Sequence, residues 1–168
     1  MERFTYAITC MAPQPSDHML EIGCGTGQAA VLLFPLIQQG KLYLIDRSAS
    51  MLKKAAEKLP ASVVTERADF PDWKSRKKFD KIFAFNVSDS WGKTGAAFLR
   101  SISLHLAANG QYWVFHQGPP GSGSGLNRQI VQKLKESVPG SGLLMIHTEE
   151  KAIVPSPVLA VKFVKEKS

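Results

Sequence analysis

The sequence predicts an α/β fold: a doubly wound, mostly parallel sheet with helices on both of its faces. Short apolar runs rich in β-branched residues alternate with segments of helical periodicity along most of the 168 residues, the pattern of a parallel sheet with crossover helices. A glycine turn or a polar residue follows several of the expected strands. The content of 44% apolar and 21% charged residues is that of an ordinary globular domain, which we expect to span residues 1–168 as a single unit.

The stretch LEIGCGTG, residues 20–27, organises the rest of the chain. A buried strand leads into a turn containing Gly23, Gly25 and Gly27, which remove side chains where the backbone turns sharply and approaches a ligand. A helix follows, and its first N–H groups point their partial positive charge at whatever occupies the turn. Glu21 stands out because a buried strand would prefer an apolar residue at this position.

The remaining elements follow from hydrophobic periodicity and from breaker residues. Strands are expected near residues 19–23, 41–46, 62–66, 79–85, 111–116, 143–147 and 158–164, and helices over 1–12, from about 27, and over 48–59, 92–108 and 126–137. Prolines are expected to end helices at Pro13, Pro15, Pro35 and Pro60. Ser48 suits the N-cap of the helix that it begins, and the pair Asn109-Gly110 suits a helix C-terminus.

Polar side chains follow the strands that surround the glycine turn. Asp46, Asp69, Asn86 and His116 each stand at or just beyond the end of an expected strand. Because ligands of parallel sheets gather outside the carboxyl ends of the strands, we expect these side chains to share one rim. Asp46 lies 19 positions after Gly27, near the offset of about 20 residues at which an acidic residue meets a ribose. A carboxylate that begins a turn is the competing explanation of Asp46.

The pattern E-x-G-x-G-x-G in residues 21–27 resembles motif I of class I S-adenosylmethionine (SAM) dependent methyltransferases. A dinucleotide-binding fingerprint would read G-x-G-x-x-G, whereas here position 28 is Gln and the third glycine stands at 27. The resemblance runs from about Met19 to His116 and continues more loosely to the C-terminus. It implies SAM as the cofactor and a seven-stranded sheet whose last strand is antiparallel.

The resemblance also implies roles for individual residues. Asp46 would bind the ribose hydroxyls, Asp69 would accept a hydrogen bond from the adenine amino group, and Glu21 would lie near the methionine moiety. The cofactor-binding residues expected on this basis are Glu21, Gly23, Cys24, Gly25, Gly27, Asp46, Arg47, Met51, Asp69, Phe70 and Asn86. Plain core packing is the alternative for Met51 and Phe70, and a turn or helix cap is the alternative for Asp69.

The segment that follows the fourth strand departs from one branch of this family. Methyltransferases that act on base amino groups show D/N-P-P-Y/F here, whereas residues 86–89 read NVSD. Asn86 fits a position near the methyl donor, but no proline follows it and no aromatic residue is placed to stack an extruded base. The segment therefore argues against methylation of exocyclic base amines.

The catalytic residue is not identified by the sequence. Methyl transfer from a sulfonium requires in-line positioning of the acceptor and, for some acceptors, removal of a proton. His116 and Asp89 are the candidate bases, although His116 can equally be a strand-end histidine without a chemical role. Trp91 and Tyr6 are candidates for lining the acceptor or facing the sulfonium.

The net charge of +7 leaves two interpretations of the surface open. Basic residues cluster at 74–81 and 162–167, the second group ending in Lys167, and such clusters can bind nucleic acid. No aromatic side chains interleave with them to stack bases, which favours a solvated surface. The two cysteines have no metal-ligand spacing, so no metal site is expected and a reducing cytoplasm is the expected location. No secretory signal is visible, and no apolar stretch reaches the ~18 residues of a membrane span.

The expected function is SAM-dependent methyl transfer to a small-molecule acceptor. An RNA or nucleic-acid methyltransferase, a nicotinamide-dependent oxidoreductase and a catalytically silent SAM-binding partner subunit remain as alternatives. Because the loops are short, the acceptor site is expected to be open and shallow. The Gly/Ser/Pro loop 118–125 acting as a lid, or a second subunit of a homodimer, would complete it.

Overall fold

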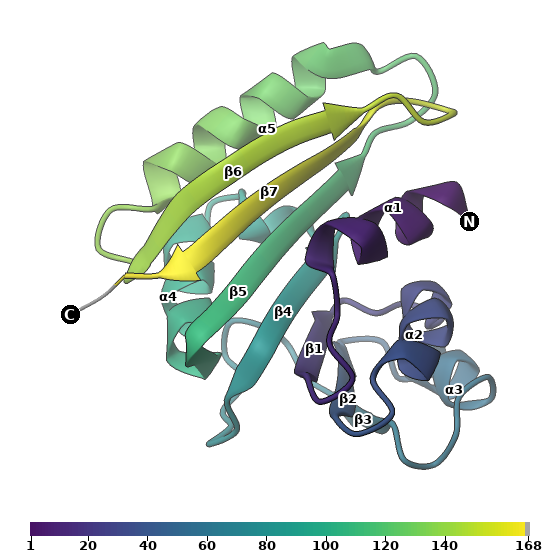
Figure 1. Cartoon of the computed structure of the whole chain (residues 1–168). Coiled ribbons are helices and arrows are strands. Elements are labelled where there is room, and N and C mark those ends of the chain that lie inside the picture. Colours follow the sequence, from purple (N-terminus) through teal and green to yellow (C-terminus); the bar gives the residue numbers. More distant parts are fainter. Residues whose placement is uncertain (167–168) are drawn as a thin grey trace.

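The chain folds around one seven-stranded sheet with helices on both faces (Figure 1). The computed structural model describes residues 1–166, so Lys167 of the expected C-terminal basic group lies outside the described residues. The strands are β1 (His18–Ile22), β2 (Lys41–Asp46), β3 (Val64–Arg67), β4 (Phe79–Phe85), β5 (Leu106–Gln117), β6 (Leu143–Lys151) and β7 (Val158–Lys165). The helices are α1 (Glu2–Met11), α2 (Gln28–Leu33), α3 (Ala49–Ala56), α4 (Gly95–His105) and α5 (Gly123–Ser137).

The strand order is β3-β2-β1-β4-β5-β7-β6. The pairings among β1 to β5 are parallel, and β7 runs antiparallel to both of its neighbours. The predicted doubly wound sheet with an antiparallel last strand is therefore confirmed. Because β1 and β4 lie side by side at the centre, the chain leaves β1 towards β2 and β3 and returns to the other side of β1. This reversal opens a crevice at the carboxyl ends of the strands.

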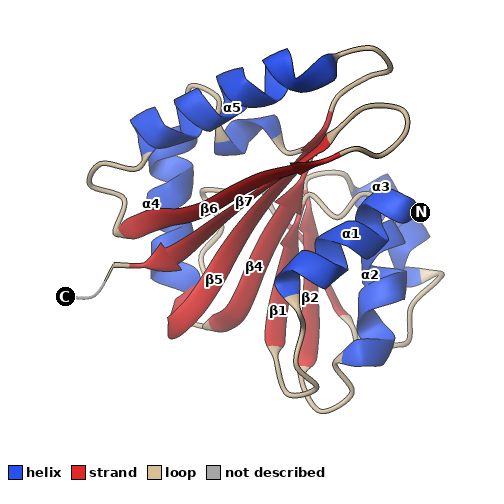
Figure 2. Cartoon of the chain, turned by 45° about the horizontal axis from the view of Figure 1, so that its top comes forward, coloured by secondary structure: helices blue, strands red, loops and turns tan. Residues whose placement is uncertain are grey.

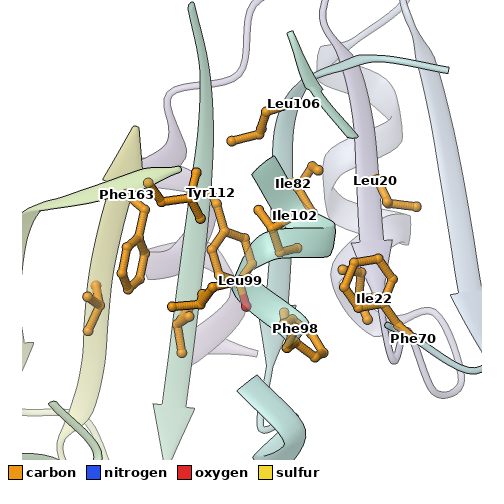
Figure 3. Close-up of a cluster of buried hydrophobic side chains, with 14 of the residues drawn as sticks. Leu20, Ile22, Phe70, Ile82, Phe98, Leu99, Ile102, Leu106, Tyr112 and Phe163 are labelled. Carbon is orange, nitrogen blue, oxygen red and sulfur yellow. The ribbon is translucent and has the colours of Figure 1, made fainter. Parts of the chain in front are cut away.

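The helices form two layers, α1, α2 and α3 on one face of the sheet and α4 and α5 on the other (Figure 2). Under α4, the side chains of Phe98, Leu99 and Ile102 are fully buried against Tyr112 of β5 and Phe163 of β7 (Figure 3). Their spacing places them on one face of the helix, as the periodicity predicts. Among residues 1–166, none of the helices combines the length and the apolar character that a membrane crossing requires.

Local sequence signals account for most helix ends. The Ser48 hydroxyl accepts the N–H of Met51 at 3.4 Å, so the predicted N-cap of α3 is confirmed. Ala12 adopts the left-handed conformation and ends α1 before the prolines. Pro35 lies in the 3₁₀ turn η1 (Phe34–Leu36) that follows α2. The helix α3 ends at Ala56, earlier than the proline that was expected to stop it.

The boundary between α4 and β5 was predicted wrongly. The helix ends at His105 rather than at residue 108, so Asn109 and Gly110 lie inside β5 instead of capping the helix. Leu106 is fully buried and pairs with Phe79 of β4. Pairing in the sheet therefore outweighs the helical propensity of the residues that begin β5. A Cβ on Gly110 would lie 2.9 Å from the Phe79 carbonyl oxygen, so this glycine permits a close strand approach beside the register shift.

Candidate functional site

A cavity of about 360 Å³ opens at the carboxyl ends of β1, β2, β3 and β4. It is the place where the sequence predicted a binding site, and it lies at the reversal of strand order. The predicted site residues that line it are Gly23, Gly25, Asp46, Arg47, Met51, Asp69, Phe70, Asn86 and Asp89. The predicted residues that are not part of its lining are Glu21, Cys24, Gly27 and His116.

The three glycines of the turn are required for different physical reasons. All three have positive φ, +67° at Gly23, +54° at Gly25 and +74° at Gly27. A Cβ on Gly23 would lie 2.6 Å from the Val87 side chain, and one on Gly27 would lie 3.0 Å from that of Ala55 in α3. A Cβ on Gly25 would meet nothing within 4 Å. The outer glycines therefore permit close packing, whereas the middle one keeps backbone exposed towards the cavity.

The carboxylate of Asp46 ties the glycine turn to the start of α3. One oxygen accepts the N–H of Gly25 at 2.9 Å and the other accepts the N–H of Ser48 at 2.8 Å. An ionised carboxylate offers about four acceptor positions, so each oxygen retains capacity for a further donor. Asp46 is thus a turn residue that also lines the cavity, and the two explanations offered by the sequence are compatible.

Asn86 joins the ends of β4 and β5. Its Oδ1 accepts the backbone N–H of Gln117 at 2.8 Å, and its Nδ2 donates to the Gln117 carbonyl at 3.1 Å. The backbone of Asn86 has φ +57°, a left-handed conformation that asparagine tolerates better than most residues. This side chain fixes the geometry of the rim while it lines the cavity.

The structure separates the two residues for which core packing was the alternative. Met51 is 38% exposed and lines the cavity, whereas the adjacent Leu52 is buried, so Met51 is not a core residue. Phe70 is 6% exposed, and its ring packs edge-on against Phe98 at 4.6 Å between centroids. Phe70 therefore belongs to the core beneath α4 and also forms part of the cavity wall. Asp69 precedes it and lines the same cavity.

Glu21 and Cys24 lie behind the glycine turn. Glu21 is 3% exposed, and its Oε2 has no hydrogen-bond partner within residues 1–166. Burial, reinforced by the nearby Asp46 carboxylate, raises the pKa of Glu21 to about 8. Burial, followed by the charges of Glu21 and Asp46, also raises the pKa of the Cys24 thiol. Cys24 packs in the core, and its burial disfavours the thiolate form.

The two candidate bases lie in different environments. Asp89 lines the cavity, in the 3₁₀ turn η2 (Ser88–Ser90) that follows β4. The Nδ1 atom of His116 lies 3.0 Å from Oδ1 of Asn127 in α5, and its ring meets that of Trp91 edge-on. Tyr6 donates its hydroxyl to a glutamate of β6 at 2.7 Å and so holds α1 against the sheet edge. Asp89 lines the cavity, whereas its described lining does not include His116, Trp91 or Tyr6.

Sequence reasoning missed two residues at this rim. Gln117 is 5% exposed and bonds Asn86, but the strand before it was expected to end one residue earlier, at His116. Had the strand been extended, Gln117 would have joined the set of polar strand-end residues. Arg3 hydrogen-bonds the Gln117 side chain at 3.5 Å across 114 positions of sequence. No local signal indicates such a contact.

Comparison with known proteins identifies the family. A family model described as "Methyltransferase domain" matches residues 20–112, more than half of the chain. The chain belongs to the class I SAM-dependent methyltransferases. The match begins in β1, includes the glycine turn and Asp46, and ends in β5, so it contains every predicted cofactor-binding residue. The cofactor of this family is SAM.

The curated relatives of this methyltransferase domain are longer proteins. Trans-aconitate 2-methyltransferase of Acidovorax sp. (strain JS42) is 34% identical over 93 residues, which are 55% of this chain and 35% of that protein. The enzyme of the same name from Azoarcus sp. (strain BH72) is 32% identical over 112 residues, 65% of this chain and 44% of that protein. The chain thus spans between about a third and under half of the length of these relatives.

Solved structures share the fold of this methyltransferase domain at lower identity. A Haloferax volcanii methyltransferase, in complex with the Trm112 methyltransferase activator, superposes with a TM-score of 0.80 at 14% identity, covering 98% of this chain and 88% of that chain. The N-methyltransferase NodS from Bradyrhizobium japonicum WM9 gives 0.72 at 16% identity, with coverage of 99% and 96%. At these identities the likeness establishes the fold alone.

Proposed function

We propose that this domain transfers a methyl group from SAM to a small-molecule acceptor. The observation that carries the proposal is the bond from the Gly25 N–H to the Asp46 carboxylate at the wall of one cavity. This bond holds the Asp46 carboxylate, a hydrogen-bond acceptor, beside the backbone of Gly25, where no side chain blocks the approach of a ligand. A ligand with both a sugar diol and an extended chain fits such an arrangement.

The residues present fit the cofactor. Asp46 retains acceptor positions for the ribose hydroxyls, and Asp69 supplies a second carboxylate for the adenine amino group. Met51 and Phe70 supply apolar surface for the adenine ring. The unpartnered buried Oε2 of Glu21, behind the turn, supports its assignment to the methionine end. These assignments, with Gly23, Cys24, Gly27, Arg47 and Asn86, make up the proposed cofactor site.

Methyl transfer requires little of the chain beyond positioning the acceptor and the methyl donor. The cofactor supplies a methyl group that is already activated by the sulfonium charge. The rim formed by Asn86 and the residues after it holds the acceptor in line with that methyl group. For an acceptor that must lose a proton, Asp89 is the candidate base, because it lies in the turn that follows Asn86 and lines the same cavity. His116 remains the second candidate.

The names of the curated relatives support a small-molecule acceptor. They are called trans-aconitate 2-methyltransferases, and trans-aconitate is a small tricarboxylate. The open cavity, with no residue of the loop 118–125 in its lining, suits a small acceptor that enters from solvent. Two free cysteines, Cys10 and Cys24, support a reducing cytoplasmic location. A single functional domain over residues 1–168, able to form a homodimer, completes the proposal.

The basic cluster around the start of β4 gives little support to a nucleic-acid substrate. Lys81 is buried and ion-paired with Asp17. Lys77 lies over the ring of Tyr43, with its Nζ 5.5 Å from the ring centroid, and Lys78 donates to a backbone carbonyl of α4. These cations are engaged by the protein itself, so fewer are free to neutralise phosphates.

Calorimetry with SAM, S-adenosylhomocysteine (SAH), NAD and NADP tests the cofactor. We expect the first two ligands to bind and the nicotinamide ligands not to bind. Binding of NADP without SAM would refute the proposal and favour the oxidoreductase. Transfer of a labelled methyl group from SAM to a metabolite panel that includes trans-aconitate then tests catalysis. SAM binding without any turnover, alone or with added partners, would favour the silent subunit instead.

A further inference from the structure

A second cavity, of about 380 Å³, lies beside the first. Its walls come from the first turn of α1, from Gln28 at the start of α2, from Gln117 at the end of β5, and from the connection between β6 and β7. These segments are far apart in the sequence and meet at the same rim as the proposed cofactor site. In Figure 1, α1 lies against the sheet beside β4 and β5.

The two cavities share a wall. Gln117 lines the second cavity, and its backbone is bonded at both its N–H and its carbonyl by Asn86, which lines the first. Phe85 also lines the first cavity, and its ring centroid lies 5.3 Å from the Arg3 guanidinium carbon, which belongs to the second. A ligand bound in the second cavity therefore lies next to the first cavity, at the ends of β4 and β5.

Arg3 is fixed in place on this wall. Its guanidinium carbon lies 4.6 Å from the ring centroid of Phe4 and 5.3 Å from that of Phe85, and Nη1 donates to Oε1 of Gln117 at 3.5 Å. The Gln117 amide is itself held, because its Nε2 donates to the Ser156 carbonyl at 2.9 Å. Two aromatic rings and an anchored amide hold the guanidinium in place before any ligand arrives.

The charge of Arg3 is not neutralised by an ion pair in the part of the chain that the structure describes. No carboxylate forms an ion pair with it within residues 1–166. Of the described side chains that line the cavity, Arg3 is the one cation, and Glu2 is an exposed carboxylate. A guanidinium has five N–H donors in a planar fork that matches a carboxylate, and one of them is used here. The remaining donors are available to an anionic ligand.

We propose that the second cavity holds the carboxylate end of the acceptor, which Arg3 binds, while the reacting atom of the acceptor lies at the Asn86 rim of the first cavity. The inference rests on the proposed methyl-transfer function and narrows its substrate to small carboxylic acids. The bound carboxylate orients the acceptor, and the shared wall at Asn86 and Gln117 sets its distance from the methyl donor. Gln28, exposed at the start of α2, supplies a neutral amide for another polar group of the acid.

The experiment uses calorimetry on the whole chain. SAH is titrated first into the wild type, Arg3→Gln, Arg3→Lys and Arg100→Gln, where Arg100 is an exposed residue of α4 on the other face of the sheet. Each SAH complex is then titrated with citrate, succinate and glutarate, and with succinamide as an uncharged analogue. We expect Arg3→Gln to weaken acid binding by about 10- to 100-fold. Arg3→Lys should retain part of the affinity, and Arg100→Gln should behave as the wild type, as should SAH binding by every variant.

Three outcomes overturn the inference. Equal acid affinity of Arg3→Gln and wild type, or no acid binding by the wild type, would remove Arg3 and its cavity from acceptor recognition. A tenfold loss of SAH affinity in Arg3→Gln would assign the guanidinium to the carboxylate of the cofactor. Failure of the wild type to bind SAH would count against the proposed function. The acid titrations are therefore repeated without SAH, so that the role of Arg3 is tested separately. Thermal melting of each variant confirms that the comparison is made on folded protein.

Discussion

The carboxamide of Asn86 binds the backbone of Gln117 at both its N–H and its carbonyl, at 2.8 and 3.1 Å. The two residues end neighbouring strands, 31 positions apart in sequence. Asn86 lines the proposed cofactor cavity and Gln117 lines the cavity that contains Arg3. One side chain therefore sets the relative position of the two cavities, and it does so from a left-handed backbone conformation.

Replacing Asn86 should destabilise the chain and loosen this rim. Asn86→Ala loses two hydrogen bonds and forces alanine into positive φ, so we expect it to lower the free energy of unfolding by about 2–4 kcal/mol. Asn86→Gly loses the same bonds but tolerates the backbone, so it should cost about 1 kcal/mol less. Urea unfolding measures both, with the exposed Asn109→Ala as the control. If both Asn86 variants were as stable as the wild type, the role given to Asn86 would be contradicted.

The carboxylate of Asp46 should support both the turn and ligand binding. Asp46→Ala leaves the Gly25 and Ser48 N–H groups without their acceptor, at a cost of about 1–3 kcal/mol in unfolding free energy. The same variant should weaken SAM binding by about 10-fold or more, because the ribose hydroxyls lose a charged acceptor. The exposed Asp72→Ala removes an equal charge elsewhere and should do neither. Calorimetry and urea unfolding in parallel would reveal if only one of the two effects occurs.

The glycines of the turn should respond differently to alanine. Gly23→Ala places a methyl group 2.6 Å from the Val87 side chain, so we expect it to destabilise the fold by about 2–4 kcal/mol. Gly25→Ala incurs only the strain of positive φ, about 1 kcal/mol, but adds a methyl group at the cavity wall and should lower SAM affinity. Gly121→Ala, with φ +81° and open space around it, isolates the backbone strain. Equal SAM affinity of Gly25→Ala and Gly121→Ala would count against the cavity as the cofactor site.

Burial of Glu21 should make stability depend on pH. Its pKa in the folded chain is raised from an ordinary 4.5 to about 8, so the native state binds more protons than the unfolded state between these values. The free energy of unfolding should therefore fall as pH rises through this window, by up to about 5 kcal/mol, and level off above it. Glu21→Gln should flatten the profile, whereas the exposed Glu57→Gln should leave it unchanged. Urea unfolding at pH 5, 6.5 and 8 provides the measurement. A flat wild-type profile would show that burial does not raise the pKa of Glu21.

Most of the fold could be predicted because its signals are local. The bounds of β2 and β4 agree with their apolar runs, and the N-cap at Ser48 is a matter of one side chain and the N–H three residues later. The start of β5 could not be predicted in this way. Residues 106–110 have helical propensity and a helix-stop signal, but the pairing of Leu106 with Phe79 places them in the sheet.

The sequence by itself determined the succession of strands and helices along the chain, the glycine turn, and the carboxylates at the end of β2 and after β3, because periodicity and turn chemistry act between near neighbours. Only the tertiary structure decided which of the predicted polar residues face one cavity, with Asp89 in its lining and His116 turned to Asn127 of α5. It also brought Arg3 to Gln117, across 114 positions. Contacts at such separations depend on how helices pack on a sheet, and no short pattern of residues carries that information.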